Sequence, residues 1–144
     1  MKKIIAMTLL ILIMPIFSGF LFAHEHRKAG AYEWIVGFLN EPAFSGQMNG
    51  IDLRVSSGGQ PVEGLENTLQ AAVESPDGKN IMTLRVRKRY NKPGQYAAYF
   101  LPTQPGRYSF QIEGEIQGQP VDETFTSGPT TFHDVEDSSA FRFP

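Results

Sequence analysis

The sequence contains no cysteine in its 144 residues. Without cysteine the chain has no disulfide bonds, no thiolate metal ligands, no cysteine nucleophile and no lipid-modified cysteine. It also lacks a glycine-rich phosphate-binding loop, a zinc-protease helix motif and a serine in a nucleophile-elbow context. No residue is singled out as catalytic, and we therefore expect the protein not to be an enzyme.

An excess of positive charge is also missing. The chain has 13 Lys and Arg against 15 Asp and Glu, a formal net charge of −2. Lys2 and Lys3 lie in an N-terminal apolar segment, so the remainder has 11 basic and 15 acidic residues and a net charge of −4. An acidic domain of this kind does not favour nucleic-acid binding. No small-molecule substrate is suggested by the sequence either.

The first 23 residues have the layout of a secretory signal peptide. A basic start at Lys2 and Lys3 is followed by an apolar stretch that ends at Ala23. Cleavage after Ala23 would place the mature protein in the periplasm or outside the cell. The alternative is an uncleaved helix over residues 4–22, which is nearly long enough to cross a bilayer and would anchor the domain to the membrane.

The rest of the chain consists of short alternating runs of apolar and polar residues, separated by turns rich in glycine and proline. Expected strands include residues 32–40, 51–55 and 68–74. Two near-repeats, 92–102 and 104–114, each place Pro-Gly and then a tyrosine before an alternating run. A tyrosine in that position resembles the corner tyrosine of immunoglobulin-like domains.

These patterns predict an all-β protein, an immunoglobulin-like antiparallel β-sandwich of about seven strands. The sandwich and a C-terminal tail would make one domain over residues 32–144. A polar N-terminal arm at residues 24–31 would precede it.

The sequence His-Glu-His at residues 24–26 is the strongest candidate for chemistry. If the chain is cut after Ala23, a free amine at His24 and the imidazole of His26 can enclose Cu(II) in a square plane with the two intervening amide nitrogens. In a second mode the amine and the imidazole of His24 itself form the chelate. His133 could supply a further ligand if the tail folds back. The alternative is a polar arm whose histidines bind nothing.

Two further segments are candidates for binding a partner. The loop at residues 40–50 contains Glu41, Phe44 and Met48, and an exposed loop on a rigid sandwich is a frequent place for binding. The densest run of positive charge contains Arg85, Arg87 and Arg89. It would dock an acidic partner or a membrane surface, or it is an exposed strand end whose charges prevent edge-to-edge pairing.

The chain also resembles known exported proteins over nearly all of its mature length. The segments YEWIVGFLNEPAFSGQMNGIDLRV, PVEGLENTLQAAV and TFHDVEDSSAFRFP are similar to a family of small exported prokaryotic proteins. More distantly, the succession of PV.G, PDGK and two PG.Y motifs is similar to YtkA-like and FixH-like periplasmic domains. That resemblance implies an immunoglobulin-like sandwich and, in some members, copper handling.

The terminal histidine also invites comparison with CopC-like copper carriers, whose mature chains begin with His. The chain departs from their pattern because SPDGKN, residues 75–80, lacks the histidine of their DGHP segment. Taken together, the sequence predicts an exported, non-enzymatic copper-binding protein that captures Cu(II) or hands it to a copper-handling membrane protein. The alternative is a cell-envelope interaction or structural module without a metal site. The oligomeric state is left open.

Overall fold

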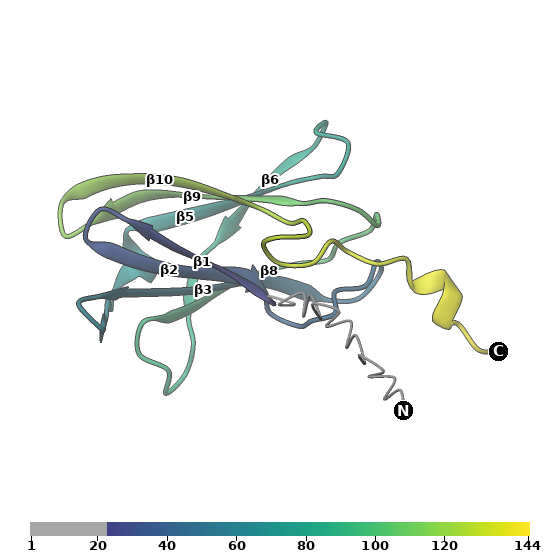
Figure 1. The fold of residues 1–144 in the computed structure, drawn as a ribbon, viewed down its shortest axis with the longest axis horizontal. Helices are drawn as coiled ribbons and strands as arrows, with labels where there is room; N and C mark the ends of the chain where they lie inside the picture. Colours follow the sequence, from purple (N-terminus) through teal and green to yellow (C-terminus); the bar gives the residue numbers. More distant parts are fainter. Residues whose placement is uncertain (1–22) are drawn as a thin grey trace, which may run out of the picture.

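Two antiparallel β-sheets pack face to face in the computed structural model, which describes residues 23–144 (Figure 1). The six-stranded sheet has the order β1-β2-β3-β8-β7, with β4 also paired to β3, and the four-stranded sheet has the order β10-β9-β5-β6. The strands are β1 (His24–Ala29), β2 (Tyr32–Phe38), β3 (Asn49–Ser57), β4 (Gln60–Pro61), β5 (Leu69–Glu74), β6 (Ile81–Arg85), β7 (Arg87–Lys88), β8 (Gln95–Phe100), β9 (Ser109–Ile116) and β10 (Gln119–Thr126).

The predicted immunoglobulin-like sandwich is therefore confirmed, with ten strands in place of about seven. Three additional short or polar strands account for the difference. β4 and β7 are only two residues long, and β1 occupies the segment that was expected to be a polar arm. The only helices of the described chain are two 3₁₀ turns, η1 (Leu65–Asn67) and η2 (Ser138–Phe141). No helix within residues 23–144 is long and apolar enough to cross a membrane.

The core lies between the two sheets and is built from alternate residues of each strand. On β2, for example, Tyr32, Trp34, Val36 and Phe38 are buried, while Glu33 is exposed and Ile35 is half-buried. Phe38 packs edge-to-face on Phe110 from the opposite sheet, with ring centroids 5.1 Å apart. Such aromatic pairs bury large apolar areas and add about 0.5–1.5 kcal/mol beyond burial.

The tyrosine of each near-repeat anchors a loop, Tyr108 its own turn and Tyr96 a distant segment. The hydroxyl of Tyr108 donates a hydrogen bond to the carbonyl of Gln104 at 2.9 Å, the four-residue contact expected of a corner tyrosine. The hydroxyl of Tyr96 donates to the carbonyl of Val62 at 2.6 Å. Both tyrosines are buried, so each ties a loop to the end of a core strand.

The prediction of a polar arm at residues 24–31 was wrong, because residues 24–29 form the edge strand β1. β1 pairs with β2 from His24 opposite Gly37 to Ala29 opposite Tyr32. Its inward-facing residue Arg27 lies 4.2 Å from the ring centroid of Phe125 and binds Glu123 of β10 at 3.0 Å. The guanidinium therefore does what an apolar side chain does in the other strands: it holds β1 against the second sheet.

The tail beyond β10 packs on the sandwich as far as Val135. Phe132 is fully buried and stacks on Phe110 at 5.1 Å, and Val135 forms an antiparallel bridge with Gly106. Beyond Val135 every residue except Ser138 is exposed, and Phe143 is 94% exposed. The predicted signal peptide and the alternative anchor at 4–22 lie outside the described residues.

Candidate functional site

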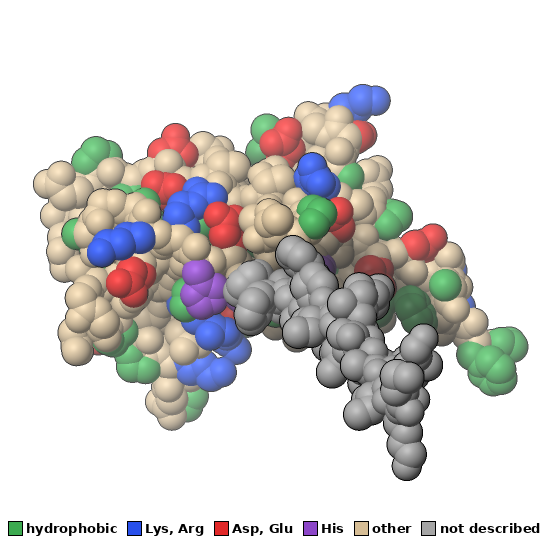
Figure 2. Space-filling view, in the orientation of Figure 1, with side chains coloured by type: hydrophobic (Ala, Val, Ile, Leu, Met, Phe, Trp, Pro, Cys, Tyr) green, Lys and Arg blue, Asp and Glu red, His purple; other side chains and the backbone are tan. Residues whose placement is uncertain are grey.

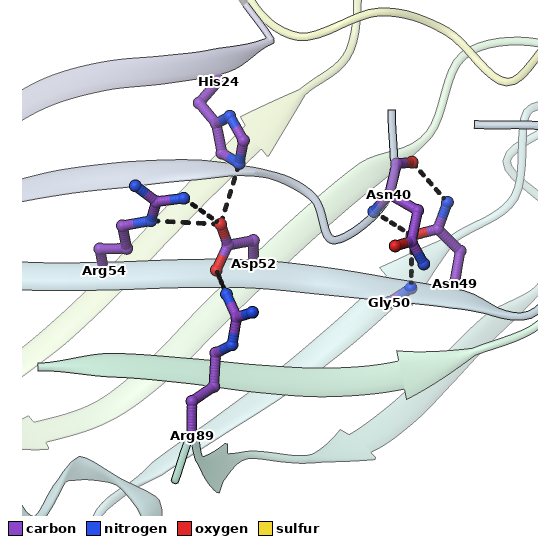
Figure 3. Close-up of polar contacts among 7 residues, drawn as sticks. All are labelled: His24, Asn40, Asn49, Gly50, Asp52, Arg54 and Arg89. Carbon is purple, nitrogen blue, oxygen red and sulfur yellow. Dashed lines mark hydrogen bonds and ion pairs between the residues drawn. The ribbon is translucent and has the colours of Figure 1, made fainter. Parts of the chain in front are cut away.

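A buried aspartate on the outer face of the six-stranded sheet organises the polar residues around it (Figure 3). β3 alternates, so that Ile51 and Leu53 point into the core and Asp52 points away from it, yet Asp52 is only 2% exposed. One carboxylate oxygen, Oδ2, accepts from Nε2 of His24 at 3.0 Å and from Nη2 of Arg54 at 2.7 Å. The other, Oδ1, accepts from Nη1 of Arg89 at 3.1 Å.

Small neighbours make room for this cluster. In the register of the sheet, Asp52 lies between Gly37 on β2 and Ala97 on β8, and His24 lies opposite Gly37. A Cβ atom at Gly37 would come within 2.6 Å of the Ala23 carbonyl oxygen and 2.9 Å of the His24 ring. Glycine at this position therefore lets the start of β1 lie close to β2 and lets the imidazole cross over to Asp52.

The electrostatics of the cluster favour the ionised aspartate. Burial on its own would raise the pKa of Asp52, but the hydrogen bonds from His24 and Arg54 and the positive charge of Arg54 lower it below the usual value of 3.8. A carboxylate partner on Nε2 also sets the tautomer of a neutral His24. With the proton on Nε2, the nitrogen nearer the backbone, Nδ1, carries the lone pair.

A second histidine–carboxylate pair joins the tail to the loop between β2 and β3. Nδ1 of His133 lies 3.4 Å from Oε2 of Glu41. The base of the loop is tied by Asn49, whose side chain accepts from the Asn40 amide at 3.0 Å and donates to the Asn40 carbonyl at 2.9 Å (Figure 3). The tail therefore does fold back on the domain, which was the condition for His133 as a ligand, and its role as a metal ligand stays a prediction.

The negative charge of Glu41 is poorly compensated by hydrogen bonds in this position. Neither carboxylate oxygen has a hydrogen-bond partner of normal geometry within the described residues, and both are buried. Burial raises the pKa of Glu41 above its usual 4.5, and the backbone amide of Phe38 and the positive charges of His133 and His24 offset this only in part. His24 lies opposite Gly37, at the end of β2 that leads into the loop of Glu41, so His24 and His133 lie at the same end of the sandwich.

The three predicted metal ligands are only partly brought together. His26 is exposed and lies two residues along β1 from His24, opposite Ile35 and away from Asp52. Within residues 23–144, no group of three or more His, Asp or Glu side chains is arranged to hold a metal ion. Any metal site at this end would therefore need a donor beyond these side chains, such as a terminal amine.

The predicted partner-binding residues are separated by the fold. Phe44 is half-buried and packs edge-to-face on Phe141 at 5.1 Å, whereas Met48 is 66% exposed. The basic run divides at Val86: Arg85 lies on β6 of the four-stranded sheet and Arg87 on β7 of the six-stranded sheet. Arg89 turns back to Asp52. The run is therefore not one continuous patch.

Asp52 and its neighbours Arg54 and Gly37 were missed as site residues. The sequence IDLRV shows Asp52 and Arg54 on the polar face of a strand, which is the ordinary pattern of a solvent-exposed face. Only the register, which places Gly37 and Ala97 on either side of Asp52, reveals that the carboxylate is covered. The only signal in the sequence for a covered carboxylate is a small residue on each neighbouring strand. Which small residues lie beside Asp52 is known only once the register of the strands is known.

Comparison with known proteins shows the fold alone. No protein-family model matches the sequence, and no curated protein matches it significantly. A crystal structure of a DUF4426 family protein from Pseudomonas aeruginosa is similar with a TM-score of 0.58 and 16% identity, over 79% of this chain and 98% of that one. The similarity to YtkA-like, FixH-like and CopC-like domains stays a prediction.

Weaker similarities are also found. The Lin-41 filamin domain has a TM-score of 0.42 and 20% identity, over 70% of this chain and 91% of that domain. A DUF4785 family protein from Legionella pneumophila has a TM-score of 0.47 and 11% identity, over 76% of this chain and 29% of that protein.

Proposed function

We propose that the protein is an exported carrier that binds Cu(II) through the free amine and the imidazole of His24, after cleavage at the Ala23–His24 bond. The observation that carries this proposal is the 3.0 Å hydrogen bond between Nε2 of His24 and the buried Asp52. Histidines that bind metals usually give their other ring N–H to a carboxylate, which fixes the ring and increases the basicity of the ligating nitrogen.

The chelate geometry agrees with this assignment. Nδ1 is the ring nitrogen that can close a ring with the amine of the same residue, and it is the atom that Asp52 leaves without a proton. The amine has an ordinary pKa of about 7.7–8.0, so Cu(II) can displace its proton near neutral pH. Nitrogen donors suit Cu(II) in a tetragonal arrangement.

The alternative square-planar mode fits β1 less well. It requires the deprotonated amides of both Glu25 and His26. Alternate amides of an antiparallel strand point at the partner strand, so one of these two consecutive amides is directed at β2. Use of both would separate the start of β1 from the sheet, and the chelate of His24 alone would not.

Copper titration of three forms of the protein tests the proposal. Mass analysis of the exported protein should give His24 as its first residue, and this form should bind one equivalent of Cu(II) with a visible d–d band. His24→Ala should weaken binding about 100-fold, because the second donor of a chelate acts at a high effective concentration. The matched variant His26→Ala should change the affinity less than about threefold.

Two results would contradict the proposal. A mature chain that starts at another residue removes the amine from His24. A large loss in His26→Ala with little change in His24→Ala would assign the copper to the square-planar mode, because that mode uses the imidazole of His26 and not that of His24. A protein that retains Ala23 serves as a further control. Its His24 nitrogen is part of a peptide bond and is not a free amine, so this protein should bind Cu(II) about as weakly as His24→Ala.

A further inference from the structure

The outer face of the six-stranded sheet concentrates positive charge around His24. Strand alternation and register place these charged and ionisable residues on that face: His24, His26, Lys28, Glu33, Asp52, Arg54, Arg87 and Arg89. Four are permanent cations and two are carboxylates. Figure 2 shows Lys and Arg side chains beside a histidine over the strands β1 to β3.

One of the two carboxylates does not present its charge to solvent. The Asp52 side chain is 3% exposed, whereas those of Arg54 and Arg89 are 41% and 28% exposed. Asp52 therefore orients the guanidinium groups of Arg54 and Arg89 from its covered position beneath them in the sheet surface. Each guanidinium has five N–H donors, and the contacts to Asp52 use Nε and Nη2 of Arg54 and Nη1 of Arg89. The remaining edges are held in place at the surface.

Arg87 adds a third guanidinium in the same row. It lies opposite Ala97, which itself lies opposite Asp52. Ala97 is short, so no long side chain rises between Arg87 and the Asp52 cluster. Arg87 is exposed and forms no ion pair within the described residues.

The opposite face of the sandwich, the outer face of the four-stranded sheet, carries mainly negative charge. The outward row across the four-stranded sheet runs from Asp122 through Glu113 and Gln70 to Arg85. Glu74 and Glu115 lie on the same face, so that four carboxylates accompany one arginine there. The molecule is thus polarised across its thickness, which orients an approaching charged partner.

We infer that this basic face, made of Arg54, Arg87 and Arg89 around His24, docks an acidic protein surface. Arginine forks match carboxylates in pairs, and guanidiniums held by Asp52 lose little entropy on binding. The purpose of docking rests on the proposed copper site: a receiving protein seated here would have its own ligands next to His24. Met48 and Phe143 lie in the loop and tail, whereas Tyr99, which is 57% exposed, lies two residues from Ala97 on β8 and faces the same way; arginine and tyrosine are both enriched in protein interfaces.

The test uses the metal-free mature protein and a polyglutamate peptide, followed by amide NMR shifts. At about 20 mM salt the shifts should map to β1 and to residues 52–54 and 87–89, and they should vanish near 300 mM salt because exposed charges are screened. Arg87→Glu should weaken binding about tenfold. The matched variant Arg85→Glu, two residues away on the other sheet, should change it less than about twofold.

Several outcomes would overturn the inference. Equal effects of Arg85→Glu and Arg87→Glu would show unspecific charge attraction, and shifts confined to the loop at 40–48 would place the partner elsewhere. Binding to phosphatidylglycerol vesicles without binding to polyglutamate would assign the face to a membrane. Cu(II) titration of the same variants keeps the two proposals apart: a wild type that binds the peptide but no Cu(II) retains the docking face and loses the copper site.

Discussion

Two carboxylates at one end of the sandwich respond to burial in opposite ways. The pKa of Asp52 is lowered because hydrogen bonds and arginine charge outweigh burial, so its ion pairs stabilise the fold above pH 3.8 and lose this effect as the pH falls through the lowered pKa. The pKa of Glu41 is raised because burial dominates. Its ionised form therefore destabilises the fold at neutral pH, and that penalty disappears at pH values below its usual pKa of 4.5.

Glu41→Gln should consequently stabilise the metal-free protein at pH 7, by on the order of 1 kcal/mol, because a neutral amide costs less to bury than a charge. The advantage should shrink as the pH falls and disappear below 4.5, where Glu41 becomes protonated in both the folded and the unfolded chain. Urea denaturation across this pH range measures the difference, with exposed Glu115→Gln as a control. A destabilised Glu41→Gln at pH 7 would show instead that the contact with His133 outweighs burial.

At the scale of elements, β1 explains where sequence reasoning succeeded and failed. The runs that became β2, β3, β5, β8 and β9 are visible because apolar residues alternate in them. In HEHRKA the inward positions are Glu25, Arg27 and Ala29, so the alternation exists without the apolar side chains that usually reveal it. A charged inward residue becomes favourable only when Phe125 and Glu123 of another sheet meet it, and the sequence does not specify that contact.

Arg27 should therefore be the residue that holds β1 to the sandwich. It bridges Glu25 at 2.6 Å and Glu123 at 3.0 Å and covers the ring of Phe125. Arg27→Ala should lower the free energy of unfolding by about 1–2 kcal/mol and speed amide exchange in residues 24–29. Arg27→Lys should fall between the wild type and Arg27→Ala, because it keeps the charge and loses the fork.

Urea denaturation and hydrogen exchange measure these effects. Lys28→Ala is the matched control, since Lys28 is adjacent on the strand but exposed on the other face. Similar losses for Arg27→Ala and Lys28→Ala would mean that backbone pairing with β2 alone holds β1.

At the scale of the whole molecule, the core is closed by the C-terminal tail, a segment whose sequence shows no regular alternation of apolar and polar residues. The sandwich class, the turns and the anchor of Tyr108 to Gln104 follow from local patterns, because each depends on neighbours within a few residues. The site does not, because it assembles β1, the β2–β3 loop, β3, the segment after β7 and the tail. His24 was identified by its place after an apolar leader, whereas Asp52 and Glu41 acquire their roles only from residues 28 and 92 positions away.

The tail should accordingly be part of the domain as far as Val135 and dispensable beyond η2. Phe132 is fully buried, stacks on Phe110 and lies edge-on to Phe38 at 5.6 Å. Phe132→Ala should cost about 3–5 kcal/mol of stability, because it leaves a cavity where the two sheets meet the tail. Phe143→Ala, at a side chain that is 94% exposed, should stay within about 0.5 kcal/mol of the wild type. Chemical denaturation of both variants measures the contrast, and a Phe132→Ala protein as stable as Phe143→Ala would show that the sandwich closes without its tail.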